Sequence, residues 1–231
     1  MNKAEALAKI EELKQYIDNM DSFNIEMVEI KDLTETPFNI GIYPVTNEQY
    51  RFIFPNHEPD KDSNLPVVNV SWEDCQEYIR LLNEKTGRNF ALPTEHQWLV
   101  CATFDGTVYS GSNDIDDVAW YDENTKTIMP VGLKKPNKMG LYDMSGNVWE
   151  WCADKYNYSS YEVFNKVKLA MNPKGPTKSY DPDEPLVEKR VMRGGSFLCN
   201  ESYCSGYRVS ARMKSSADSS MEHLGFRCVS N

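Results

Sequence analysis

Long apolar runs are missing from this chain of 231 residues, and no stretch of about 18 apolar residues is present that would cross a bilayer. The first residues, MNKAEALAKIEEL, carry charges throughout and lack the apolar centre of a secretory signal. We therefore expect a cytoplasmic protein without a membrane partner.

Basic residues are also in short supply. The sequence has 25 Lys and Arg against 35 Asp and Glu, which gives a formal net charge of -10. Because nucleic-acid binding depends on clustered Lys and Arg, this balance argues against a nucleic-acid partner. An acidic surface keeps a protein soluble, and its second use is to attract basic ligands.

Cysteine and histidine are too rare for several classes of site. Six cysteines are too few for a disulfide scaffold, and the three histidines, His57, His96 and His223, are scattered. The sequence also lacks the GxSxG and HExxH motifs and a phosphate-binding loop with its lysine. We expect the cysteines to be a mixture of buried thiols, one bridge and one reactive pair.

What is present suffices for one domain. Hydrophobic residues make up 40% of the chain, enough for a core. We place the domain at residues 25–231, preceded by an N-terminal segment, residues 1–24. Within 3–20, apolar residues recur every three or four positions and predict an amphipathic helix packed on the domain: Leu7, Ile10, Leu13, Ile17 and Met20.

Three helix starts are marked by capping residues. Thr46 and Thr94 are each followed three residues later by glutamine, the pattern of a capping box. Ser71 caps a third helix, which Gly87 ends. On that third helix Cys75 falls in the apolar stripe, so we interpret it as an inert core thiol.

The remaining segments are strands and loops. Residues 25–30 and 38–45 are predicted to be strands, and a short helix is predicted over 47–54. Residues 103–137 are rich in Gly, Asp, Asn and Pro and predict loops and short strands. Residues 155–190 are polar and contain four prolines, which indicates a long surface excursion.

The segment GLYDMSGNVWEWCAD, residues 140–154, alternates aromatic and acidic side chains around a glycine turn. Asp143 and Glu150 offer carboxylates, and the turn between them exposes backbone carbonyls. Hard cations such as Ca²⁺ prefer oxygen ligands of this kind. The spacing is not that of an EF-hand, so a hydrogen-bonded structural turn is an equal alternative.

Two cysteines, Cys199 and Cys204, lie five residues apart shortly after Gly194-Gly195. The spacing is too wide for a CxxC redox motif. From chemistry alone an ordinary disulfide is the first interpretation, and a catalytic or metal-binding pair, including two thiolates on Cu(I), is the second. Tetrahedral zinc is last because it requires two further ligands.

Taken together, several motifs resemble the formylglycine-generating enzyme family, the sulfatase-modifying oxidases. They run from about Met27 to Cys228 and read GIYPVTNEQY (41–50), PVVNVSWEDC (66–75), ALPTEHQWLVCA (91–102), MPVGLKKPNKMGLYDMSGNVWEWCAD (129–154) and RGGSFLCNESYCSGYR (193–208). The resemblance implies an α+β single domain, a variant of the C-type-lectin-like fold with little regular secondary structure.

The same resemblance implies a copper-dependent oxidase. Cys199 and Cys204 would hold Cu(I), and O₂ would be used to convert a cysteine in a Cys-x-Pro-x-Arg segment of a sulfatase client to formylglycine. The positions that match the family's pocket for oxygen and substrate are Ser196, Tyr203 and Trp149, and those that match its peptide-binding residues are His223 and Arg208.

Two further features are implied by the resemblance. The family's calcium ligands match Asp143 and Glu150 through carboxylates and Gly146 and Val148 through backbone carbonyls. A disulfide partnership matches Cys101 and Cys228. The sequence departs from common family patterns after the first loop cysteine, at Asn200-Glu201, Gly206 and Val209.

Two other functions compete with the oxidase. One is a non-catalytic ligand-binding module on the same lectin-like scaffold, in which Cys199 and Cys204 would be surface residues or a disulfide. The other is an iron-dependent relative acting on small thiols, which the three scattered histidines disfavour. For each of these functions we expect a monomer.

Overall fold

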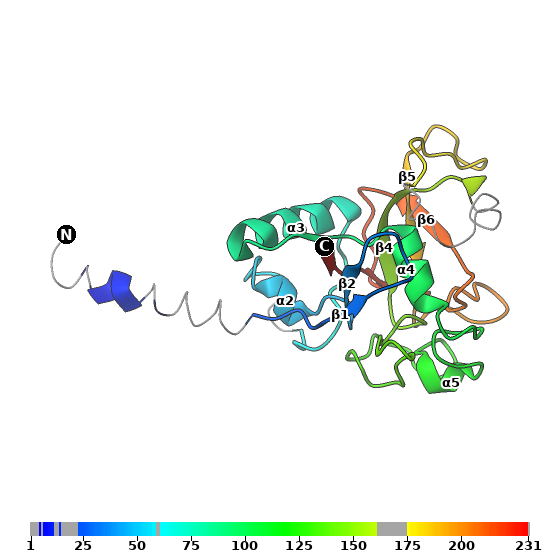
Figure 1. The fold of residues 1–231 in the computed structure, drawn as a ribbon, viewed down its shortest axis with the longest axis horizontal. Coiled ribbons are helices and arrows are strands. Elements are labelled where there is room, and N and C mark those ends of the chain that lie inside the picture. Colours follow the sequence, from blue (N-terminus) through cyan, green and yellow to red (C-terminus); the bar gives the residue numbers. More distant parts are fainter. Residues whose placement is uncertain are drawn as a thin grey trace.

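The computed structural model describes residues 5, 7–11, 14, 23–58, 61–160 and 175–230. Its described part contains two four-stranded sheets (Figure 1). The strands of the first sheet, in order, are β1 (Met27–Ile30), β2 (Phe38–Gly41), β8 (Val229–Ser230) and β3 (Phe90–Ala91). Those of the second are β6 (Met213–Ser216), β5 (Lys189–Arg193), β4 (Trp149–Lys155) and β7 (Leu224–Gly225).

The first sheet joins the two ends of the domain. β8, close to the C-terminus, lies between β2 and β3, and Val229 is opposite both Ile40 and Ala91. The pairs in this sheet are antiparallel, whereas β4 and β7 of the second sheet run parallel. Every described strand except β4 has five residues or fewer, which confirms the expectation of little regular secondary structure.

The helices that accompany the sheets are α2 (Asn47–Arg51), α3 (Trp72–Thr86), α4 (Glu95–Ala102) and α5 (Ile115–Val118). The three predicted starts are confirmed, since Thr46, Ser71 and Thr94 each form a complete capping box. Gly87 ends α3 at a φ of 69°, a left-handed conformation that suits glycine.

Two predicted elements are shorter than expected. β2 ends at Gly41, although the amide of Ile42 still donates to Glu26 in register with β1, and the amide of Val45 donates instead to Phe226. α2 ends at Arg51, and residues 52 and 53 continue as a turn. Hydrophobic periodicity indicates where an element lies, but its end depends on which partner takes each backbone group.

Buried side chains form two hydrophobic clusters. Cys75, Tyr78 and Cys228 belong to the first, and Trp98 and Cys101 belong to the second. Cys75 is fully buried, and burial raises its thiol pKa well above the ordinary value. Its prediction as a core thiol is confirmed.

The predicted burial of the N-terminal helix is not found at its described residues. Residues 5, 7–11 and 14 are helical, but Leu7 and Ile10 are 57% and 49% exposed. An apolar stripe predicts a helix without specifying the surface that covers it. The other residues of the predicted stripe, Leu13, Ile17 and Met20, lie outside the described residues.

Long connections fill the space between the strands. Residues 103–137 are mainly loop, as predicted, but they contain the unpredicted helix α5 and isolated bridges in place of short strands. Of the predicted excursion over 155–190, β5 takes the last residues, while 161–174 lie outside the described residues. Within the described part of the chain, no helix is long and apolar enough to span a membrane.

Candidate functional site

The cysteine pair lies in the connection from β5 to β6, residues 194–212, which we call the cysteine loop. Gly194 and Gly195 begin it with φ of 94° and 74°. A β-carbon on Gly195 would collide with backbone atoms of Gly206 and Tyr207, so the two arms of the loop run against each other. Glycine is required here both for its conformation and for the close approach.

Cys199 and Cys204 are joined in a disulfide, with their Cα atoms 5.2 Å apart. The carbonyl of Asn200 accepts hydrogen bonds from the amides of Cys204 and Ser205, each at 3.0 Å, which folds the residues between the cysteines into a tight turn. Cys199 is buried at 2% exposure, and Cys204 is half-buried. The loop thus brings two sulfur atoms together, one of them accessible.

Aromatic rings surround the pair. Trp149 of β4 is buried, and a β-carbon on Gly206 would meet both its ring and the sulfur of Cys204. Tyr207 packs between Tyr109 and Tyr121, with ring centres 5.8 Å and 5.5 Å away. These rings form an apolar wall beside the sulfur atoms.

Ser196 is the polar residue of the predicted set that reaches the cysteines. Its hydroxyl lies 3.9 Å from the sulfur of Cys199, within hydrogen-bonding distance for sulfur. The hydroxyl also accepts a hydrogen bond from the amide of Leu198 at 3.3 Å. Ser196 can therefore donate a hydrogen bond to a thiolate at Cys199.

Tyr203, predicted at the oxygen and substrate pocket, is an exposed residue of the cysteine loop, and its role there stays a prediction. Its side chain is 81% exposed. Tyr203 therefore belongs to the outer surface of the cysteine loop.

Of the two predicted substrate-binding residues, Arg208 lies within the cysteine loop and His223 lies beyond β6. His223 precedes β7, and its carbonyl accepts a hydrogen bond from the amide of Trp149 at 2.8 Å. Burial lowers the pKa of its imidazole, which favours the neutral ring. Arg208 donates to Glu201 at 3.1 Å and lies 5.8 Å from the ring centre of Tyr109.

The four residues matched to calcium make other contacts. The Glu150 carboxylate accepts two hydrogen bonds from the Arg227 guanidinium, each at 2.7 Å, and one from the Trp98 indole at 2.8 Å. Asp143 accepts from the amide of Gly132 at 2.8 Å, and burial raises its carboxyl pKa to about 6.

The Arg227 guanidinium thus forms an ion pair with the Glu150 carboxylate, the group that would otherwise bind a calcium ion. The described residues contain no group of three or more His, Cys, Asp or Glu side chains that could hold a metal. Calcium binding at Asp143, Gly146, Val148 and Glu150 stays a prediction and enters no step below.

The implied Cys101–Cys228 disulfide is not formed. Both residues are free, buried thiols, and burial raises the pKa of each to about 12. Cys101 packs in the same cluster as Val229, whereas Cys228 packs in the other cluster with Cys75. Successive residues of an extended chain point to opposite faces, and this separates the two thiols.

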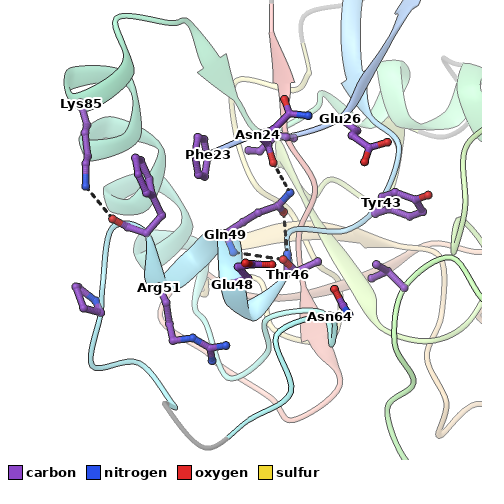
Figure 2. Close-up of a pocket in the computed structure, with 14 residues that line it drawn as sticks. Phe23, Asn24, Glu26, Tyr43, Thr46, Glu48, Gln49, Arg51, Asn64 and Lys85 are labelled. Carbon is purple, nitrogen blue, oxygen red and sulfur yellow. Dashed lines mark hydrogen bonds between the residues drawn. The ribbon is translucent and has the colours of Figure 1, made fainter. Parts of the chain in front are cut away.

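A cavity of about 620 Å³ lies between α2 and residues 23–26, which precede β1, and none of the predicted site residues lines it (Figure 2). Lys85 at one end donates to the carbonyl of Phe52 at 3.0 Å. Arg51 donates to the carbonyl of Glu58 and the hydroxyl of Ser63. Because these cations already have partners, we place the candidate site at the cysteine loop.

Sequence reasoning missed a buried charge cluster beside that loop. Arg193 and Arg212, the residues at its two ends, both contact the carboxylate of Glu95 on α4. The available signal was an arginine on each side of the loop. Its acidic partner, more than ninety residues away in sequence, carried no signal.

Asp154, a residue of β4, connects that strand to the start of α4 beside this cluster. Its carboxylate accepts from the amide of Glu95 at 2.7 Å, and its pKa is raised to about 6, mainly by burial, with Glu95 adding to the shift and Arg212 opposing it. A raised carboxyl pKa means that the folded state holds the proton more tightly than the unfolded state. Its contribution to stability therefore falls as pH rises from about 4 to about 6.

We expect Asp154→Asn to remove this pH dependence. The free energy of unfolding of the variant, minus that of the unchanged protein, should rise by about 2–3 kcal/mol between pH 4 and pH 7. Urea unfolding at four pH values in that interval measures it. Parallel pH curves for the two proteins would show that Asp154 titrates at its ordinary pKa.

Comparison with known proteins places this site in a family. A family model described as Sulfatase-modifying factor enzyme 1-like domain matches residues 18–231. The formylglycine-generating enzyme of Thermomonospora curvata is 34% identical over 185 residues, which cover 73% of this chain and 56% of that protein. That of Mus musculus is 32% identical over 188 residues, covering 73% and 45%. The chain spans about half the length of these curated relatives.

Solved structures agree on the fold. Treponema denticola variable protein 1 superposes with a TM-score of 0.67 at 22% identity, covering 90% of this chain and 92% of that one. The expected α+β fold, a variant of the C-type-lectin-like fold, is confirmed. The chain belongs to the family of sulfatase-modifying factor enzyme 1-like domains.

Proposed function

We propose that this chain is a formylglycine-generating oxidase, which uses O₂ and Cu(I) to convert a cysteine in a Cys-x-Pro-x-Arg segment of a sulfatase to formylglycine. The observation that carries the proposal is the pairing of Cys199 with Cys204 beside Trp149, in a chain whose relatives are named formylglycine-generating enzymes. In this proposal the protein works in the cytoplasm as a monomer.

The donors at the cysteine loop fit a soft monovalent ion. Reduction of the disulfide frees two thiolates that the Asn200 turn keeps close together, and Cu(I) prefers thiolate ligands and is content with two. Bound copper would supply the redox chemistry with O₂ and a further position for the client's sulfur. The aromatic wall of Trp149 and Tyr207 excludes water from the buried side of the pair.

The protein's own residues would orient the reactants. The hydroxyl of Ser196 donates a hydrogen bond toward Cys199 and stabilises its thiolate. Cys204, the more accessible sulfur, faces the side from which a client approaches. The net charge of -10 favours approach of a client segment that carries arginine.

The overall reaction balances with an added thiol as reductant. The client cysteine loses two electrons at its β-carbon to give a thioaldehyde, and hydrolysis releases hydrogen sulfide and leaves the aldehyde. Two molecules of thiol are oxidised to a disulfide and supply the other two electrons that reduce O₂ to water. The same reductant keeps Cys199 and Cys204 as thiols.

The test is to incubate the reduced protein with Cu(I), a Cys-x-Pro-x-Arg peptide and glutathione in air, and to look for the aldehyde by mass spectrometry. We expect product from the unchanged protein and from Cys101→Ala, a matched control for a buried thiol outside the pair. We expect none from Cys199→Ala or Cys204→Ala. Equal product from these variants, or none from the unchanged protein, contradicts the proposal.

A ligand-binding module is the second candidate, favoured by the outer surface of the cysteine loop. Tyr203 and Leu198 are 81% and 39% exposed there, as they would be on a recognition surface. The Cys199→Ala variant of such a module would bind a polypeptide as tightly as the unchanged protein does. The mass of the bound polypeptide would stay the same.

A further inference from the structure

The cysteine loop connects two neighbouring strands, so its ends are held close together. β5 and β6 pair antiparallel, with Met192 opposite Met213. Arg193 follows the first of these residues, and Arg212 precedes the second. We call this point, where the loop leaves and rejoins the sheet, the neck of the cysteine loop.

One carboxylate bridges the neck. Glu95 is 1% exposed and lies at the start of α4, far from the loop in sequence. Its Oε1 accepts from Nε of Arg193 at 2.9 Å and from Nε of Arg212 at 2.6 Å, and its Oε2 accepts from Nη2 of Arg212 at 2.8 Å. Both ends of the loop are therefore fixed to the same buried group.

The arginine from the first end also reaches the second end directly. Nη1 of Arg193 donates to the carbonyl of Ala211 at 2.7 Å. Nη1 of Arg212 donates to the carbonyl of Asn157, which holds the second end against the segment after β4. Ion pairs and backbone contacts thus converge at the neck of the cysteine loop.

We propose that Glu95 is a positioning residue for the cysteine pair, acting through Arg193 and Arg212 to hold the two arms of the loop together. The arms meet where Gly195 lies against Tyr207, and Cys199 and Cys204 lie beyond that contact. Closing the neck raises the effective concentration of one sulfur at the other. The chemical role of the cysteine pair rests on the proposed function. The effect of Glu95 on the distance between the two sulfur atoms does not.

The chain offers a matched control on the same two strands. Asp181 is fully buried, and its carboxylate bridges Lys189 of β5 and Lys214 of β6 at 2.6 Å and 2.7 Å. Lys189 is opposite Ser216, at the end of the strand pair away from the loop. Loss of Asp181 therefore removes a comparable bridge without opening the neck.

The experiment measures how readily the pair forms its disulfide. In glutathione buffers one oxidised glutathione takes two electrons from the two thiols, giving the Cys199–Cys204 disulfide and two reduced glutathiones. Trapping the thiols and mapping peptides by mass spectrometry gives the equilibrium constant for this pair alone. Circular dichroism and urea unfolding confirm that each variant is folded.

We expect Glu95→Gln to shift the exchange equilibrium toward the dithiol by about fivefold or more. Arg212→Lys, which keeps the charge but loses the paired hydrogen bonds, should shift it by about two- to threefold. Asp181→Asn should lower the stability of the protein but leave the equilibrium within about twofold of the unchanged value.

An unchanged equilibrium in folded Glu95→Gln overturns the proposal, as does an equal shift in Asp181→Asn. If Glu95→Gln does not fold, an unchanged exchange equilibrium in folded Arg212→Lys overturns the proposal instead. Because the measurement uses neither copper nor a client peptide, a missing aldehyde product counts against the proposed function alone. An unchanged exchange equilibrium counts against the role of Glu95 alone.

Discussion

Replacing Arg227 by methionine is expected to lower the free energy of unfolding by about 3–5 kcal/mol, because it leaves the charge of Glu150 buried without a cation. Both side chains are fully buried, and the two groups share a bidentate ion pair. The guanidinium also donates to the carbonyls of Gly41 and Tyr142. Methionine can replace none of these hydrogen bonds.

A matched surface substitution separates burial from charge. Arg80 on α3 pairs with Glu77 and Glu84, but all three side chains are at least half exposed. Arg80→Met should therefore cost less than about 1 kcal/mol. Urea unfolding of both variants measures the difference, and equal losses would show that the buried pair contributes no more than the surface pairs.

A double variant tests whether the loss comes from the unpaired charge. Glu150→Gln keeps an acceptor for the Trp98 indole but carries no charge. We expect Arg227→Met to cost at least about 1 kcal/mol less when Glu150→Gln is already present. Strict additivity of the two substitutions would indicate that lost packing, not charge, causes the effect.

Gly195→Ala is expected to cost about 3 kcal/mol or more and to weaken Cu(I) binding at the cysteine loop. An added methyl group meets the amide nitrogen of Tyr207 and the backbone of Gly206, and backbone atoms cannot move aside as a flexible side chain can. The substitution also places alanine at a φ of 74°, in the left-handed region. The two arms of the loop must then separate.

Gly87→Ala provides the control, because it shares the conformational cost without the collision. Gly87 has a φ of 69°, and nothing lies within 4 Å of the position of an added β-carbon. We expect it to cost about 1–2 kcal/mol and to leave Cu(I) binding unchanged. Urea unfolding and competition with a Cu(I) chelator compare the two variants. Equal effects on both measurements would show that the contact between the arms is unimportant.

Much of the site was accessible from sequence because its key pattern is local. Cys199 and Cys204 are five residues apart, and the turn at Asn200 that pairs them is closed by backbone hydrogen bonds within the same segment. Trp149 and Ser196 also lie where the family motifs placed them. Motif matching gives a position in the chain but not the exposure of its side chain, and Tyr203 is 81% exposed.

The sequence alone determined where α2, α3 and α4 begin, since each start depends on a capping residue and a partner three residues later. Thr94 and Gln97 satisfy each other's backbone amides without help from the rest of the chain. Tertiary structure alone decided that Cys101 and Cys228 stay apart, that Leu7 and Ile10 are exposed, and that one glutamate bridges the neck of the loop. The physical reason is distance along the chain: Glu95 meets its two arginines across 98 and 117 residues, and only the completed sheets bring them together at the cysteine loop.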